Sequence, residues 1–353
     1  MNHWLMRSII LLLISITAYA KPFIHPDMEA AIHENESLQK RGIKPQGWLN
    51  PKRPTGFHPT SNFYKGGTFL QHQADPTPVP TEFDMRTKSY SPVRGQIQGS
   101  CWAEGNVSAF EMTWNFIKGT KLVFGVNDVI DCSGYGSAWS GGQLSMQYDT
   151  KAGLALESVY PYTGRDGRCK KDVARSNQLR AAPFLRGANG GFPSEPELKA
   201  AIFKYGAMEV CGASSSLGSG GRQDTPRSGR VDHCYAVVGW LDGKAKGWLD
   251  ASYFIIKNSW GDGSNSALNL SGGDWGDNGY GYYRLSLDGK VLRGSTITEI
   301  QVADTGLPLI QPGPTETKLS NSDVTLTVTV GKDSKIQSQK LIDNLKLTFG
   351  GLK

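Results

Sequence analysis

The sequence predicts an α+β protein with two lobes, the first rich in helix and the second rich in strand. Ala103, Val107, Phe110, Trp114 and Ile117 recur at steps of four and three, so their side chains share one face of a helix. The second half carries apolar runs that are typical of buried strands. We expect these strands at about residues 207–212, 233–240, 252–258 and 279–285. This order favours a cleft between the two lobes.

Residues 1–20 have the anatomy of a secretory signal peptide. Arg7 lies in a short charged region, an apolar run follows from Ile9 to Ile16, and Ala18-Tyr19-Ala20 offers small residues for cleavage. The apolar run is shorter than the roughly 20 residues that cross a bilayer. We therefore expect a secreted or periplasmic product with no stable membrane insertion. An uncleaved signal anchor is the alternative.

Residues 21–79 contain eight prolines and one plausible helix, at about Asp27–Arg41. Too little of this segment is apolar for it to bury a core of its own. We therefore expect it to be separate from a larger domain that starts near residue 80. The net charge of +6 is modest for 353 residues, and basic residues are scattered among acidic ones. A nucleic-acid partner is excluded because it would need a concentrated basic face.

Cys101 lies at or just before the start of the helix with the apolar face. The free amide hydrogens and the dipole of a helix N-terminus favour an anion, and a thiol is a strong nucleophile only as its thiolate. This position is therefore suited to a reactive cysteine. The alternative for a single cysteine is a buried structural role, which two further observations disfavour.

The first observation is that five of the six histidines precede residue 80, which leaves His233 as the single imidazole downstream. His233 starts an apolar run that is typical of a buried strand. The second is Asn258, which follows another apolar run and precedes Trp260 by two residues. The Asn258 amide can accept the imidazole N–H and fix its tautomer, while the indole keeps water away.

These residues lie in four motifs that follow one another along the chain, Gly99-Ser100-Cys101-Trp102, Val231-Asp232-His233, Lys257-Asn258-Ser259-Trp260-Gly261 and Asn278-Gly279-Tyr280-Gly281. Over about residues 80–300 the chain resembles the papain family of cysteine peptidases, and the separation of Cys101 and His233 falls in that family's range. The resemblance implies a papain-like two-lobed fold with a helical N-terminal lobe, a β-rich C-terminal lobe and the active site in the cleft between them.

The resemblance implies that Cys101 is the nucleophile, His233 the general acid and base, and Asn258 the residue that orients His233. It also implies a glutamine shortly before the nucleophile, whose amide and the Cys101 N–H stabilise an oxyanion. Gln96 fits the family's approach to the site, and Gln98 competes with it because the spacing is one residue shorter than usual. No cofactor is implied, and no metal is expected because only one histidine remains in this domain.

The same resemblance implies which residues contact the substrate. A Gly-Gly pair offers its backbone edge to an extended peptide, and two cysteines form the wall of the pocket for the side chain two residues before the cut. The implied contacts are Gly141, Gly142, Cys211, Val231, Asp232, Cys234 and Trp260.

The chain has five cysteines, and four remain if Cys101 is the nucleophile. In an exported protein these four can form two disulfides in three connectivities. The resemblance implies a bridge between Cys132 and Cys169, which the chain-entropy relation values at roughly 3 to 4 kcal/mol. For Cys211 and Cys234 two alternatives stay open, a bridge across the pocket wall or two free thiols that act as small apolar groups.

Three features depart from the family pattern. Glu104 replaces an aromatic residue and either alters the stability of the thiolate or faces solvent. Gly105, in the first helical turn, costs about 1 kcal/mol relative to alanine. Residues 262–274 form an insertion, which we expect to overhang the leaving-group side of the cleft and to narrow specificity there.

The chain is thus divided into a signal peptide (1–20), an inhibitory prosegment (21–79), a papain-like peptidase domain (80–301) and a linker with a β-rich extension (302–353). The predicted function is a secreted, monomeric cysteine peptidase, made as a zymogen, that hydrolyses peptide or protein substrates through a thioester acyl-enzyme. Its own prosegment is the expected intramolecular inhibitor. Two alternatives remain, a transpeptidase that uses the same acyl-enzyme and a catalytically weakened peptide-binding or adhesion protein.

Overall fold

The structure, a computed structural model, describes residues 23–43, 53–73, 78–142, 145–224, 229–284 and 297–309, and the backbone of 316–321 and 324–329. The signal peptide expected at 1–20 and most of the expected C-terminal extension lie outside these residues. The chain divides into two compact units, residues 1–309 and 310–353. The second unit contains an antiparallel hairpin of β10 (Glu316–Asn321) and β11 (Val324–Thr329). Among the described residues, no helix is both long and apolar enough to cross a bilayer.

The first unit contains five described helices, and the sequence provides clear caps at the end of one and the start of another. The helices are α1 (Pro26–Lys40), α2 (Cys101–Lys118), α3 (Val126–Cys132), α4 (Ser145–Lys151) and α5 (Glu195–Tyr205). Helix α2 ends at Gly119, which adopts the left-handed conformation that glycine tolerates best. Helix α5 begins with a capping box, in which Ser194 and Glu197 satisfy each other's backbone N–H groups.

Nine strands of the described residues form one mixed sheet. Its hydrogen-bonded order is β1-β3-β9-β4-β6-β7-β8-β5, and β2 pairs with β6 beside this path. The strands are β1 (Phe69–Gln71), β2 (Phe83–Asp84), β3 (Phe184–Arg186), β4 (Met208–Ala213), β5 (Gly221–Gln223), β6 (Val231–Asp242), β7 (Ser252–Lys257), β8 (Tyr280–Tyr283) and β9 (Ile297–Val302). The predicted α+β class is therefore confirmed, with the helix at Cys101 and the strands of the second half where they are expected.

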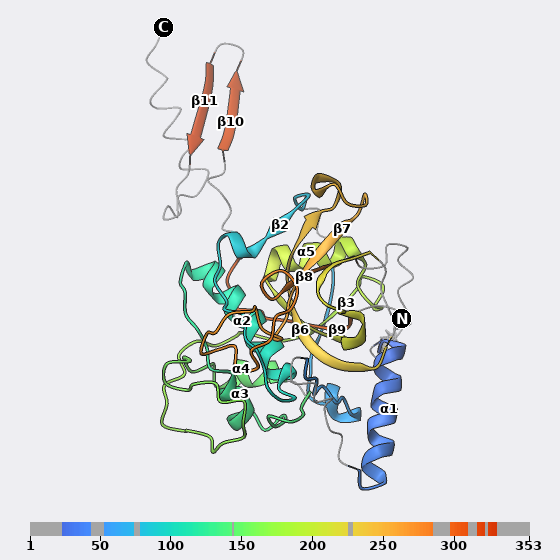
Figure 1. Cartoon of the computed structure of the whole chain (residues 1–353). Coiled ribbons are helices and arrows are strands. Elements are labelled where there is room, and N and C mark those ends of the chain that lie inside the picture. The colour runs from blue at the N-terminus through green and yellow to red at the C-terminus, as the bar shows by residue number, and fades with distance from the viewer. Residues whose placement is uncertain are drawn as a thin grey trace, which may run out of the picture. The chain divides into compact units, whose positions relative to one another are not determined.

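Helix α2 lies directly against β6 at the centre of the molecule (Figure 1). The contact is tight at Gly105, where an added Cβ would lie 3.0 Å from the Tyr235 nitrogen and 3.2 Å from the Cys234 carbonyl carbon. A side chain at this position would require β6 or α2 to shift by a few tenths of an ångström. The helix-weakening glycine of the first turn thus has a packing reason, because it allows backbone to approach backbone.

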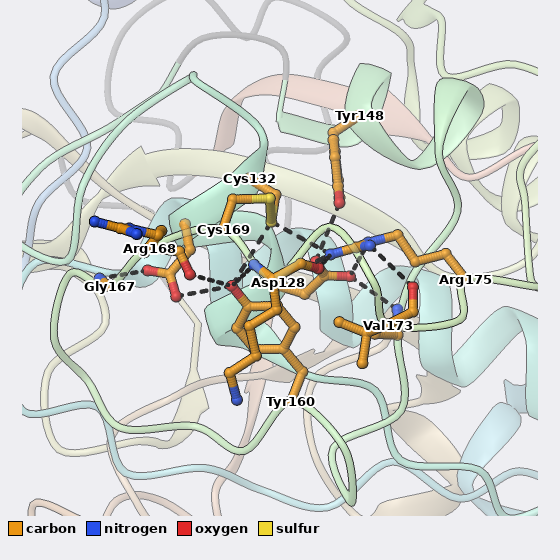
Figure 2. Close-up of a disulfide and its surroundings, with 12 residues drawn as sticks. Asp128, Cys132, Tyr148, Tyr160, Gly167, Arg168, Cys169, Val173 and Arg175 are labelled. Carbon is orange, nitrogen blue, oxygen red and sulfur yellow. Dashed lines mark hydrogen bonds and ion pairs between the residues drawn. A yellow bond between two sulfur atoms is a disulfide. The ribbon is translucent and has the colours of Figure 1, made fainter.

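A disulfide joins Cys132, at the end of α3, to Cys169 in the loop between α4 and β3. Figure 2 shows that Arg175 reaches across this bridge, where its Nη2 lies 2.6 Å from Asp128 Oδ1 and 3.3 Å from the Cys132 sulfur. Tyr148 donates to the same carboxylate at 3.1 Å. The bridge and the buried Asp128 carboxylate therefore fix the loop onto α3.

Replacing Cys132 and Cys169 together by alanine is expected to lower the free energy of unfolding by about 4 kcal/mol. The bridge closes a loop with a sequence separation of 37 residues, and a loop of that length restricts the unfolded chain by about this amount. Denaturant unfolding of the full chain and of the double variant, with the other bridge verified by mass, measures the difference. A loss below about 1 kcal/mol would contradict this account.

Candidate active site

Cys101 is the first residue of α2, and its side chain is fully buried. Its sulfur lies 4.0 Å from the carbonyl oxygen of Asp232. The thiol also interacts with the backbone of Cys234 and of Gly56. Asp232 and Cys234 flank His233 on β6, so the thiol lies against the backbone of β6 at the position of His233. The close approach of α2 and β6 produces this arrangement.

The imidazole of His233 is held in one tautomer by Asn258. His233 Nε2 lies 2.8 Å from Asn258 Oδ1, which also accepts the Ser259 backbone N–H at 2.8 Å. An amide oxygen only accepts, so Nε2 carries the hydrogen and Nδ1 keeps its lone pair. Trp260 stacks on the ring with centroids 4.6 Å apart, which shields it from water. Among the described residues, Nδ1 is buried and has no hydrogen-bond partner.

Burial keeps both side chains uncharged. It raises the pKa of the Cys101 thiol to about 12, because the charged thiolate is disfavoured away from water. It lowers the pKa of His233 to about 4, although the hydrogen bond that the ring donates to Asn258 opposes this shift. In this structure the pair is therefore a neutral thiol and a neutral imidazole.

A short part of the N-terminal region, residues 54–58, crosses this site, and we call it the occluding segment. The Phe57 N–H donates to the Asp232 carbonyl at 2.9 Å, and the Gly141 N–H donates to the Gly56 carbonyl at 3.0 Å. The His58 N–H donates back to the Gly141 carbonyl at 2.9 Å. Backbone pairing on both sides holds an extended chain across the thiol.

The carbonyl of Pro54 lies at the polar groups beside the thiol. It accepts from Trp260 Nε1 at 2.9 Å and from Gln96 Nε2 at 3.2 Å. The Gln96 amide nitrogen also donates to the Gln98 carbonyl at 2.7 Å, and its oxygen accepts from the Ser259 hydroxyl. Of the two glutamines expected to compete, Gln96 is the one whose side-chain amide contacts a peptide carbonyl at the site.

The expected substrate-contact residues line the same strip of backbone. Gly142 has φ +141°, and a Cβ there would lie 2.6 Å from the ring of Phe57. Val231 is buried at the start of β6, opposite Ala213 of β4. The structure therefore brings Gly141, Gly142, Asp232 and Trp260 to the occluding segment, and places Val231 next to Asp232 on β6.

Cys211 of β4 and Cys234 of β6 form a disulfide. They are directly paired across the two strands, one step from the pair Gly212 and His233. Of the two alternatives for these cysteines, the structure shows the bridge. Among the described residues, one group of possible metal ligands lies close together, Glu209 with these two sulfurs, and the disulfide engages both sulfurs.

Glu104 faces the interior, so the alternative in which it faces solvent is wrong. Only 1% of its surface is exposed, and its Oε2 lies 3.9 Å from Arg94 Nε. Burial raises the pKa of Glu104 to about 7, and the charges of Arg94 and Lys257 oppose the shift. The Tyr162 hydroxyl, which pairs with the Ser100 hydroxyl at 3.0 Å, is a further neighbour of this carboxylate.

Sequence reasoning missed the buried ionic group to which Glu104 belongs. Arg94 Nη2 lies 3.0 Å from Glu111 Oε1, and Lys257 Nζ donates to the Ser108 hydroxyl at 2.9 Å. The signal was present, because Glu104, Ser108 and Glu111 are spaced four and three apart. That spacing defines a polar stripe on the face of α2.

The insertion at 262–274 packs against the approach to Gln96. The Gly95 N–H donates to the Leu268 carbonyl at 2.9 Å, and the Ser271 N–H donates to the Gly95 carbonyl at 3.0 Å. Asn269 closes the loop by donating to the carbonyls of Ser264 and Gly273. Its effect on specificity at the leaving-group side stays a prediction.

The fold and the site together define a two-lobed α+β protein with a cysteine at a helix start beside a histidine–asparagine pair. Residues 79–292 match the papain family cysteine proteases, so the chain belongs to this family. It is 31% identical over 212 residues to the cathepsin L-like proteinase of Phaedon cochleariae, covering 57% of this chain and 59% of the relative. It is 32% identical to cathepsin S of Bos taurus over 54% of this chain and 60% of the relative. The matches thus span less than two thirds of these relatives.

Solved structures with the same fold include zymogens. Digestive procathepsin L2 proteinase from the larval midgut of Tenebrio molitor aligns with a TM-score of 0.57 and 21% identity, covering 78% of this chain and 89% of that one. The proform of Amb a 11, a ragweed pollen cysteine protease, aligns with a TM-score of 0.52 and 20% identity, covering 79% and 87%. At this identity the likeness establishes the fold.

Alkylation of Cys101 is expected to depend on the occluding segment. With the segment in place, the pKa values of about 12 for Cys101 and about 4 for His233 leave both groups neutral from pH 5 to 9. Iodoacetamide should then react slowly at pH 6, and on the order of tenfold faster once residues 21–79 are removed, because the rehydrated thiol can transfer its proton to His233. Mass spectrometry of the modified cysteine measures both rates. Equal rates in the two forms would contradict the account.

Proposed function

We propose that this chain is a secreted cysteine peptidase that is made as a zymogen. The observation that carries the proposal is the position of the Cys101 thiol, which lies between the backbone groups on either side of His233. Asn258 sets the tautomer of His233 so that a free lone pair remains. A nucleophile, a base and a residue that orients the base are the parts that thiol catalysis needs. Membership of the papain family supports the same conclusion.

In the proposed reaction, His233 Nδ1 takes the thiol proton and the Cys101 sulfur attacks the scissile carbonyl carbon. The carbonyl oxygen becomes an oxyanion that accepts hydrogen bonds from the Cys101 N–H and from Gln96 Nε2. The C–N bond then breaks while His233 gives its proton to the leaving amine, and a thioester remains. A water that loses a proton to His233 cleaves the thioester, which releases the carboxylic acid product and restores the thiol.

The contacts of Pro54 support the role of Gln96 as an oxyanion donor. Its carbonyl oxygen already accepts from Gln96 Nε2 and Trp260 Nε1. A donor placed this way is typically worth about 3 to 4 kcal/mol of barrier when the carbonyl becomes an oxyanion.

Inhibition by residues 21–79 is proposed from the same contacts. The occluding segment fills the backbone positions that an extended substrate needs, Gly141 and the Asp232 carbonyl. The signal-peptide pattern at residues 1–20 supports export of the precursor. The proposed substrates are peptides and proteins.

The proposed function is tested with the full-length chain and its Cys101→Ser variant, each incubated at acidic pH. We expect the wild type to cleave a peptide library and to take up one epoxysuccinyl inhibitor per chain, and the variant to do neither. Labelling without cleavage would indicate a peptide-binding protein, and transfer of the acyl group to an added amine instead of water would indicate a transpeptidase. The absence of both labelling and cleavage would refute the proposal.

Gly56→Ala is expected to release the block. An added Cβ at Gly56 would lie 2.0 Å from the Gly99 carbonyl oxygen, so the occluding segment could not keep its place over the thiol. The precursor of this variant should take up the inhibitor at least on the order of tenfold faster than the wild-type precursor, since overpacking costs about 1 to 3 kcal/mol and about 1.4 kcal/mol is already a factor of ten. Lys65→Ala, in the same region but exposed, is the matched control. A Gly56→Ala precursor that is as inert as the wild type would show that the block lies elsewhere.

A further inference from the structure

A cavity lies beside the nucleophile helix, between the two lobes of the first unit. Its walls are formed by Trp102 of α2, Gly142, Glu209 and Cys211 of β4, and Glu299 of β9. Phe57 and Phe63 of the N-terminal region close it. When residues 21–79 leave, these two rings leave with them, and the cavity opens toward the cleft.

Glu209 is the unusual group in this wall. Its carboxylate lies within 4.8 Å of both sulfurs of the Cys211–Cys234 bridge, and only 5% of the residue is exposed. Among the described residues, the structure gives this carboxylate no hydrogen bond and no ion pair. Burial is the sole cause that raises the pKa of Glu209, to about 8. A buried carboxyl without a partner is costly, so a cation that enters the cavity would be stabilised there.

The neighbouring charges do not supply that cation. Glu299 is already paired without residues 21–79, because Arg186 Nη1 lies 2.7 Å from its Oε1 and Arg186 Nη2 lies 3.1 Å from its Oε2. The Tyr64 hydroxyl, which also donates to Oε2 at 2.5 Å, leaves with residues 21–79. Asp149 of α4 is a second buried acid. Its pKa lies well above the usual range, mainly because the side chain is buried and further because Glu209 is close. The charge of Arg186 therefore offsets Glu299, and Glu209 is left as an acid for a ligand to match.

We propose that this cavity binds the side chain of a lysine or arginine of the substrate, and that Glu209 pairs with its cation. The proposal rests on the proposed peptidase function and names the substrates that the enzyme selects, namely peptides with a basic residue at one fixed position beside the scissile bond. The sulfurs of the bridge and the face of Trp102 hold the aliphatic stem of that side chain, and Glu209 meets its charged end.

The protein is produced as the full-length precursor, and residues 21–79 are then removed. The epoxysuccinyl inhibitor is used to count the active sites. Peptides are varied one position at a time with arginine, citrulline and norleucine. We expect one position at which arginine raises kcat/KM at least tenfold over citrulline, which has the same shape without the charge. In Glu209→Gln this ratio should fall to near one, whereas in the control Asp149→Asn, which removes a neighbouring buried acid that does not line the cavity, it should persist.

The ratio also depends on pH in a defined direction. Arginine binding needs the ionised carboxylate, so the ratio of kcat/KM for arginine to that for citrulline should decrease as the pH falls through the pKa of Glu209. Ionisation of Cys101 and His233 changes both kcat/KM values equally and therefore does not affect the ratio. Glu209→Gln should give a flat ratio. The other titratable or charged groups near Glu209 are Asp149, Glu299 and Arg186.

Two outcomes overturn the proposal, equal cleavage of arginine and citrulline peptides by the wild type at every position, or an unchanged arginine preference in Glu209→Gln. The first needs no variant, so the test holds even if Glu209→Gln does not fold. Cleavage without a basic preference would leave the peptidase function intact. Absence of all cleavage and labelling would instead refute the proposed function.

Discussion

The close approach of α2 to β6 is the constraint on which the site depends. At Gly105 the two backbones approach so closely that an added Cβ would lie 3.0 Å from the Tyr235 nitrogen, and four residues earlier α2 presents Cys101 beside the part of β6 that carries His233. The glycine weakens the helix by about 1 kcal/mol relative to alanine. That cost is offset by the close packing of α2 on β6 that the glycine allows. The disulfide between Cys211 and Cys234 joins β6 to β4 at this same level of the sheet.

The buried ionic group ties the same helix to the strand that positions the base. Lys257, the last residue of β7, donates to Ser108 of α2, and Asn258 follows it. Arg94 pairs with Glu111 and faces Glu104 on the same helix. Two cations and two acids thus balance in the interior, which buried charges require. This balance explains how an acid in the first turn of α2 is accommodated, and it fixes the distance between the helix of the thiol and the strand end of Asn258.

The spacing of apolar residues predicted the elements that can be identified from their own sequence. Helix α2 and strand β6 follow from apolar spacing, and β6 extends two residues beyond its expected range at each end. Strands β3 and β9 were not predicted. Strand β3 is only three buried residues long, and β9 has only a short alternation of apolar and polar residues, so both form strands only by pairing with segments far along the chain. The rare histidine and its strand position singled out His233 and Asn258, but their hydrogen bond is a tertiary contact. Within the expected prosegment, no element was predicted at residues 54–58, since their extended form is imposed by Gly141 and Asp232.

The electrostatics of the covered site account for the proposed latency of the precursor. Burial raises the pKa of the Cys101 thiol, whereas the backbone interaction with Gly56 lowers it. Exclusion of water is the larger effect, since the pKa of Cys101 rises to about 12. The proposed inhibition therefore acts mainly by keeping water from the thiol, and the charge of Asp232 raises the pKa of Cys101 in the same direction. This requirement explains why a glycine lies against Gly99, where even a methyl group would reopen a path for water.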